Sequence, residues 1–101
     1  MAALKPKART DLPMVELDGE LVIYDEHGKG LHHLNPTATV VYRCFDGQST
    51  VREITDDIAE VSGLPPDRVE RQVRRLLKDF REQGLIEGLP IVAEGSPNGQ
   101  R

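Results

Sequence analysis

The sequence predicts an α+β domain in which a small three-stranded antiparallel sheet is followed by three helices, similar to a winged helix-turn-helix. Two observations predict this order. Short apolar and β-branched runs, separated by glycine-containing turns, fill residues 14–34. Three segments with apolar residues at helical spacing come next, and each ends close to a glycine. A length of 101 residues suits one domain.

The three expected strands are short. Residues 14–17 form the first, and Asp18-Gly19 supplies turn chemistry before the second, residues 21–24. A glycine-rich turn follows at residues 26–30, and residues 31–34 form the third strand. Consecutive strands joined by short turns predict an antiparallel meander.

The first two helices carry clear start and stop signals. Asn35 is a good N-cap followed by proline, so the first helix is expected to run to about residue 45. Thr50 and Glu53 have the spacing of a capping box and open the second helix, which Gly63 ends.

The third helix is expected from Pro65-Pro66 to Gln83 and has two different faces. One face is apolar and predicts core packing: Val69, Val73, Leu76, Leu77 and Phe80. The opposite face is basic: Arg68, Arg71, Arg74, Arg75, Lys78 and Arg81. It is either a solvated face supported by pairs such as Glu70 with Arg74, or a docking surface for an acidic partner. Nucleic acid and an acidic peptide are both such partners.

Both ends of the chain are expected to lie outside the packed domain. Residues 1–12 are basic and non-periodic and predict a flexible arm, and residues 89–101 predict a flexible tail. The domain then occupies residues 13–88. No signal peptide or membrane-spanning run is recognisable, and one cysteine cannot form an internal disulfide. We therefore expect a cytoplasmic protein without a membrane partner.

Catalytic and metal-binding patterns are not recognisable in the sequence. His32 and His33 are adjacent in a predicted strand, so their side chains should point to opposite faces. Cys44 falls on the apolar face of a predicted helix, where a buried and inert thiol is expected. Metal, phosphate-loop and nucleophile motifs are missing, so we expect neither an enzyme nor a cofactor.

Three segments carry a resemblance to a known family. The run 34–38 (LNPTA) resembles the start of the first helix in PqqD-like proteins. Asp46-Gly47 with residues 50–54 (TVREI) is similar to their next segment, and residues 69–86 resemble their closing helix with its GLI end. The resemblance covers about residues 14–88.

The resemblance implies a peptide chaperone, also called a RiPP recognition element. Such domains bind the leader of a ribosomally synthesised precursor peptide. They present it to a maturation enzyme, often a radical SAM enzyme and in lasso-peptide systems a leader peptidase. The family fold, three strands and three helices, agrees with the fold expected from the residues.

The resemblance also implies a site. The leader adds as a strand to the third strand, in a groove bordered by the third helix. One flank of that helix carries Arg68, Gln72, Arg75 and Leu76, and the other carries Leu77, Arg74 and Arg81; we favour the first. The expected peptide-binding residues are Gly30, Leu31, His32, His33, Leu34, Arg68, Arg71, Gln72, Arg75 and Leu76. Without the resemblance, the strand with its two histidines would be interpreted as a solvated sheet edge.

Two other functions compete with peptide binding. A winged-helix DNA-binding regulator would use the basic third helix, but the net charge of −4 opposes it. The acidic second helix, with Asp56, Asp57 and Glu60, opposes it too, so we do not expect nucleic acid as a partner. A subunit that binds a partner protein through the same sheet edge remains the third alternative.

Overall fold

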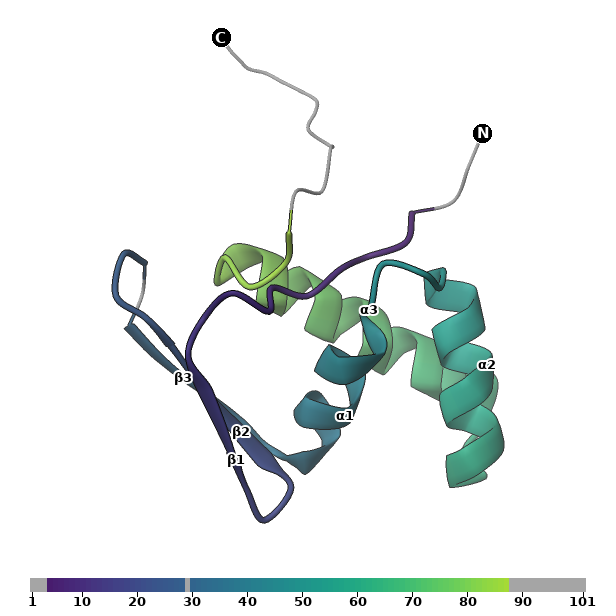
Figure 1. Cartoon of the computed structure of the whole chain (residues 1–101). Coiled ribbons are helices and arrows are strands. Elements are labelled where there is room, and N and C mark those ends of the chain that lie inside the picture. Colours follow the sequence, from purple (N-terminus) through teal and green to yellow (C-terminus); the bar gives the residue numbers. More distant parts are fainter. Residues whose placement is uncertain (1–3, 29, 88–101) are drawn as a thin grey trace, which may run out of the picture.

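Three strands precede three helices in the computed structural model, which describes residues 4–28 and 30–87 (Figure 1). The strands are β1 (Met14–Leu17), β2 (Glu20–Asp25) and β3 (Gly30–Leu34). The helices are α1 (Pro36–Cys44), α2 (Val51–Ser62) and α3 (Pro66–Glu82). This order confirms the fold class that the sequence predicts.

The sheet is an antiparallel meander with the strand order β1-β2-β3. Asp18 and Gly19 join β1 to β2 with φ of 55° and 79°, the left-handed pair that a tight hairpin turn requires. In β2, Leu21 and Ile23 are buried against the helices, and the alternate residues Glu20, Val22 and Tyr24 face outward. The helices therefore cover only one face of the sheet (Figure 1).

Local side-chain caps fix the helix starts. The Asn35 side chain accepts a hydrogen bond from the Ala38 N–H at 2.8 Å. Thr50 and Glu53 form a reciprocal capping box, with bonds of 2.8 and 3.1 Å. Gly63 closes α2 in the left-handed conformation. These caps confirm the boundaries expected for α1 and α2.

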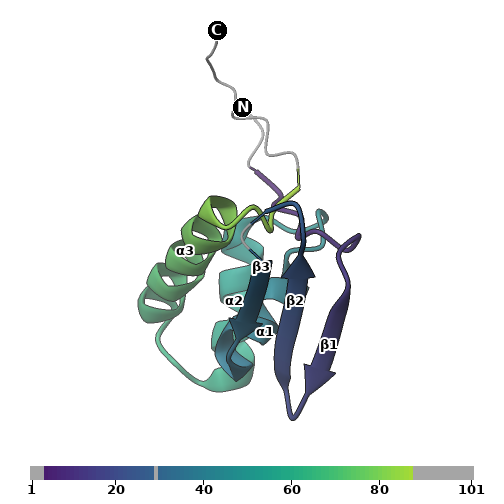
Figure 2. The same cartoon turned by 90° about the vertical axis from the view of Figure 1, so that its left-hand side faces the viewer.

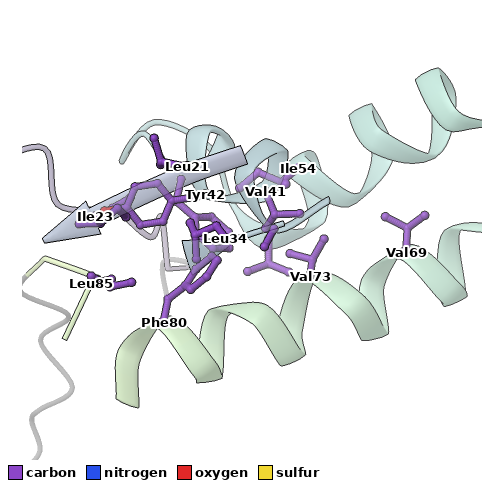
Figure 3. Close-up of a cluster of buried hydrophobic side chains, with 14 of the residues drawn as sticks. Leu21, Ile23, Leu34, Val41, Tyr42, Ile54, Val69, Val73, Phe80 and Leu85 are labelled. Carbon is purple, nitrogen blue, oxygen red and sulfur yellow. The ribbon is translucent and has the colours of Figure 1, made fainter. Parts of the chain in front are cut away.

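The core lies between the inner face of the sheet and the three helices (Figure 3). Phe80 and Val73 point from α3 toward the core residues of the sheet and α1, and Val69 lies at the other end of the helix, away from the sheet. The Phe80 ring packs edge-on against the ring of Tyr42, with centroids 5.3 Å apart, and similarly against Phe45 at 6.1 Å. The apolar face expected of the third helix is therefore core, with Leu76 and Leu77 only partly buried.

Thr39 of α1 joins the helix to the sheet through its hydroxyl group. The Leu21 N–H donates to Thr39 Oγ1 at 3.0 Å, and the hydroxyl donates to the Leu34 carbonyl at 3.1 Å. Leu21 and Leu34 are register partners in β2 and β3, so the Thr39 hydroxyl links the main chains of the two strands at this pair. This bridge fixes the end of β3 relative to α1.

The N-terminal segment differs from the flexible arm that its composition suggests. Ala8 is buried, and its N–H donates to the Phe45 carbonyl at 2.7 Å. The Arg9 N–H donates to the Leu85 carbonyl at 2.8 Å. Ala8 also forms a bridge with Ile86, which together with Leu85 makes the short stub that follows α3. Residues 6–9 are held because their backbone groups find partners at two distant places in the chain. The tail expected at residues 89–101 lies outside the described residues.

Candidate functional site

The free edge of β3 is the first feature of the candidate site. Among the described residues, β3 pairs only with β2, so its other edge has no strand partner. The Tyr24 N–H donates to the Pro13 carbonyl at 2.9 Å, which places the main-chain groups of Tyr24 on the β1 side. Those of Leu21 and Ile23 then point toward β3, because these groups alternate along a strand. By the register, Leu31 and His33 direct their N–H and C=O groups toward the free edge.

The side chains of β3 alternate between two faces. His32 and Leu34 are buried on the inner face, whereas Leu31 and His33 are exposed on the outer face. The His33 imidazole contacts the Glu20 carboxylate at 2.5 Å. The opposite orientation expected for the two histidines is therefore confirmed. Buried Nε2 of His32 has no hydrogen-bond partner within the described residues.

The basic side chains of α3 are exposed, and part of the solvated interpretation is confirmed. Nε of Arg74 donates to Oε2 of Glu70 at 2.8 Å, which is the helical pair expected from their spacing. An exposed pair of this kind contributes little to stability. Within the described residues Arg68, Arg71 and Arg75 form no ion pair, so they are available for other contacts.

An open hollow of about 630 Å³ runs along one flank of α3. Its lining comes entirely from that helix: Arg68, Arg71, Gln72, Arg75, Leu76 and Asp79. The structure thus brings together the five α3 residues expected in the site. Asp79 is an addition that the sequence analysis missed, although its spacing from Arg75 and Leu76 places it on the same flank.

β3 and α3, the two elements that carry the candidate site, lie side by side. Figure 2 shows β3 between β2 and α3, and Figure 1 shows the C-terminal part of α3 extending toward the sheet. α2 packs against α3, while β3 and α3 share few direct contacts. Gly30, Leu31, His32, His33 and Leu34 do not line the hollow itself.

Cys44, Arg9 and Asp11 lie outside the candidate site and have shifted pKa values. Cys44 is partly buried, less than its apolar position suggests, and this burial raises the pKa of its thiol. Hydrogen bonding to Asp11 raises the pKa of Arg9, and the same contact lowers that of Asp11. In residues 4–28 and 30–87, no group of three His, Cys, Asp or Glu side chains is placed to hold a metal ion.

No helix in the described part of the chain is both long and apolar enough to cross a bilayer.

Comparison with solved structures shows the same fold in another protein. The structure described as "TbiB1 in Complex with the TbiA(beta) Leader Peptide" matches with a TM-score of 0.68 and 22% sequence identity. The match covers 81% of this chain and 95% of that chain. No curated protein sequence matches this chain significantly.

Comparison with family models gives the family. The model described as "Coenzyme PQQ synthesis protein D (PqqD)" matches residues 20–86. The matched region begins at β2 and includes β3, all three helices and the Leu85-Ile86 stub. It spans most of the described residues and both parts of the candidate site. This chain therefore belongs to the PqqD family.

Proposed function

We propose that this protein is a non-enzymatic peptide chaperone. It binds the leader of a ribosomally synthesised precursor peptide by strand addition to β3 and presents that leader to a peptide-modifying enzyme, either a radical SAM enzyme or a leader peptidase. Family membership supports the proposal, because PqqD-family domains bind peptides and are not catalytic. The free edge of β3 is the observation that carries it.

Strand addition supplies affinity through main-chain hydrogen bonds. Leu31 and His33 offer the leader two N–H donors and two C=O acceptors at the free edge. Leader residues that pair with Leu31 and His33 share the outer face with them, and the residues between point toward the inner face. Gly30, His32 and Leu34 complete the strand to which the leader would add, and their main-chain groups face β2.

The flank of α3 supplies selectivity in this proposal. Arg68, Arg71 and Arg75 favour a leader with carboxylates, and Leu76 favours an apolar side chain between them. Gln72 can both donate and accept a hydrogen bond. Asp79 at the end of the hollow disfavours a carboxylate there, so the acidic part of the leader should lie toward the start of α3.

The domain needs no chemistry of its own for this role. Holding the leader converts the encounter between precursor and enzyme into a local event, which raises the effective concentration of the precursor core. The chemical step then belongs to the modifying enzyme.

A fluorescence-polarisation titration tests the leader-binding role. The probe is the labelled leader of the precursor peptide encoded nearest this gene, with a scrambled leader and a duplex DNA as controls. We expect saturable binding of the authentic leader alone. Binding of the duplex with a steep dependence on salt would instead favour the DNA-binding alternative. Equal binding of the authentic and scrambled leaders would contradict sequence-selective recognition.

A further inference from the structure

The outer face of the sheet is unusually apolar. An antiparallel sheet with one face in water normally carries polar residues on that face. Here the outward positions are mostly apolar: Val15, Leu17, Val22, Tyr24 and Leu31, with Glu20 and His33 as the polar members. Figure 2 looks onto this face, and the helices lie behind or beside the sheet in that view.

The apolar side chains on this face are strongly exposed and contiguous. Val15, Leu17 and Leu31 retain 64%, 69% and 68% of their accessible surface. The register joins Val15 to Val22 and His33 in one row, and Tyr24 to Leu31 in the next. Contiguous exposed apolar surface of this kind marks an interaction site.

Charge around the face is acidic. Glu20 is the strand carboxylate on this face and contacts His33, whereas Glu16 and Asp25 lie on the inner side, where they pair with Arg43 and Arg9. Exposed Asp18 lies in the turn between β1 and β2 and exposed Glu26 directly follows β2, with the His27 imidazole 3.9 Å from the Glu26 carboxylate. A complementary surface therefore has an apolar centre bordered by lysine or arginine.

We propose that this outer face, defined by the seven outward positions, is the docking surface for the peptide-modifying enzyme. This inference rests on the proposed function and adds the surface through which presentation occurs. The enzyme side is expected to be an apolar patch bordered by basic side chains. Strand addition makes the face continuous with the leader, because leader residues paired with Leu31 and His33 extend it beyond β3. The enzyme would then contact domain and leader together.

A second copy of this chain fits the face less well. Packing two such faces together would bring Asp18, Glu20 and Glu26 of one copy close to the same carboxylates of the other. Like charges set against each other in an interface are unfavourable. A partner whose apolar patch is bordered by lysine or arginine avoids this repulsion and buries the apolar side chains at the centre of the face.

The test compares two exposed apolar residues replaced by lysine. Leu17→Lys changes the outer face on β1, away from the expected leader-binding residues. Val61→Lys is the matched control, because Val61 is 89% exposed on α2, outside the sheet. Val15→Thr, which keeps a β-branched side chain, is a milder second variant in case Leu17→Lys perturbs folding. Denaturation midpoints check the fold of each variant.

Binding to two partners is measured for each variant. One partner is the labelled leader, and the other is the purified peptide-modifying enzyme encoded beside this gene, with the leader present. We expect all variants to keep wild-type leader affinity. Leu17→Lys should weaken enzyme binding by about tenfold or more, as for a central interface residue, with a smaller loss for Val15→Thr. Val61→Lys should keep wild-type enzyme binding.

Three outcomes would overturn the inference. Wild-type enzyme affinity in correctly folded Leu17→Lys and Val15→Thr variants would exclude the outer face as the docking surface. Absence of enzyme binding by the wild-type domain would do the same. A wild-type dimer that Leu17→Lys converts to a monomer would assign the face to a second copy, as read by sedimentation equilibrium. Failure of leader binding itself would instead contradict the proposed function.

Discussion

Replacing His33 by proline separates strand addition from all other ways of binding a peptide. The His33 N–H points to the free edge of β3, so the fold does not use it in the ladder with β2. Proline lacks this N–H but is tolerated on edge strands. It also restricts the preceding residue to extended conformations, which His32 already has within β3. The His33→Pro variant should therefore fold and lose one donor to the leader.

The expected loss of affinity follows from one missing main-chain hydrogen bond. A carbonyl of the leader would be left buried beside the proline ring without a donor, which costs about 1–3 kcal/mol. That free energy corresponds to a dissociation constant roughly 5- to 150-fold higher. His33→Ala is the matched control, because it removes the imidazole and its contact with Glu20 but keeps the N–H.

The assay is the leader titration, combined with urea denaturation followed by circular dichroism. His33→Pro should bind the leader more weakly than His33→Ala while keeping a similar denaturation midpoint. His32→Pro should behave differently, because the His32 N–H faces β2 and its loss weakens the sheet itself. Equal leader affinity for the proline and alanine variants at position 33 would refute pairing at this edge.

Three further predictions address the bridge to the sheet, the basic flank and a buried tyrosine. Thr39→Val should lower the free energy of unfolding by about 2–4 kcal/mol, because the Leu21 N–H and Leu34 carbonyl lose their partner. Thr37→Val, on an exposed position of the same helix, should change it little, and equal urea midpoints would contradict the role of the bridge. Charge reversal in R71E/R75E should weaken binding of an acidic leader by about tenfold, whereas R52E on α2 should not; unchanged affinity in the titration would exclude an electrostatic contribution. Burial raises the pKa of Tyr42 from 10.0 to about 12. The neutral phenol is therefore favoured in the folded state, and this stabilisation, complete below pH 10, should be lost as pH rises through 12. Ultraviolet titration of a Tyr24→Phe variant isolates Tyr42, and an ordinary midpoint in the folded protein would contradict its burial.

Local signals in the sequence were sufficient for most of the fold. The left-handed Asp18-Gly19 turn, the Asn35 cap and the Thr50–Glu53 capping box each depend on residues within a few positions of one another. The alternation of His32 and His33 follows from strand geometry alone. Helical periodicity places Arg68, Gln72, Arg75 and Leu76 on one flank, and with Arg71 they line the hollow; their role in binding stays a prediction.

Long-range contacts explain what the sequence could not predict. Residues 6–9 have no periodic pattern, and their order depends on backbone bonds to Phe45 and Leu85, which become neighbours only in the folded chain. The role of Thr39 could not be predicted either, because its hydroxyl bonds to Leu21 of β2 and Leu34 of β3, which it meets only in the folded chain. The exposure of Leu17 and Leu31 likewise depends on which face of the sheet the helices cover.

Side chains alternate between the two faces of a strand, and this alternation relates the two proposed surfaces, the flank of α3 and the outer face of the sheet. A leader paired with β3 would send every second side chain toward α3 and the others onto the outer face. A slip of one residue would exchange the two sets, so that the leader carboxylates expected to meet Arg68, Arg71 and Arg75 would lie on the apolar outer face instead. Main-chain hydrogen bonds cannot prevent such a slip, because they are the same in either register. If the leader adds to β3 as proposed, we expect the charged flank of α3 to set the register, and that register would also determine which leader side chains the enzyme meets.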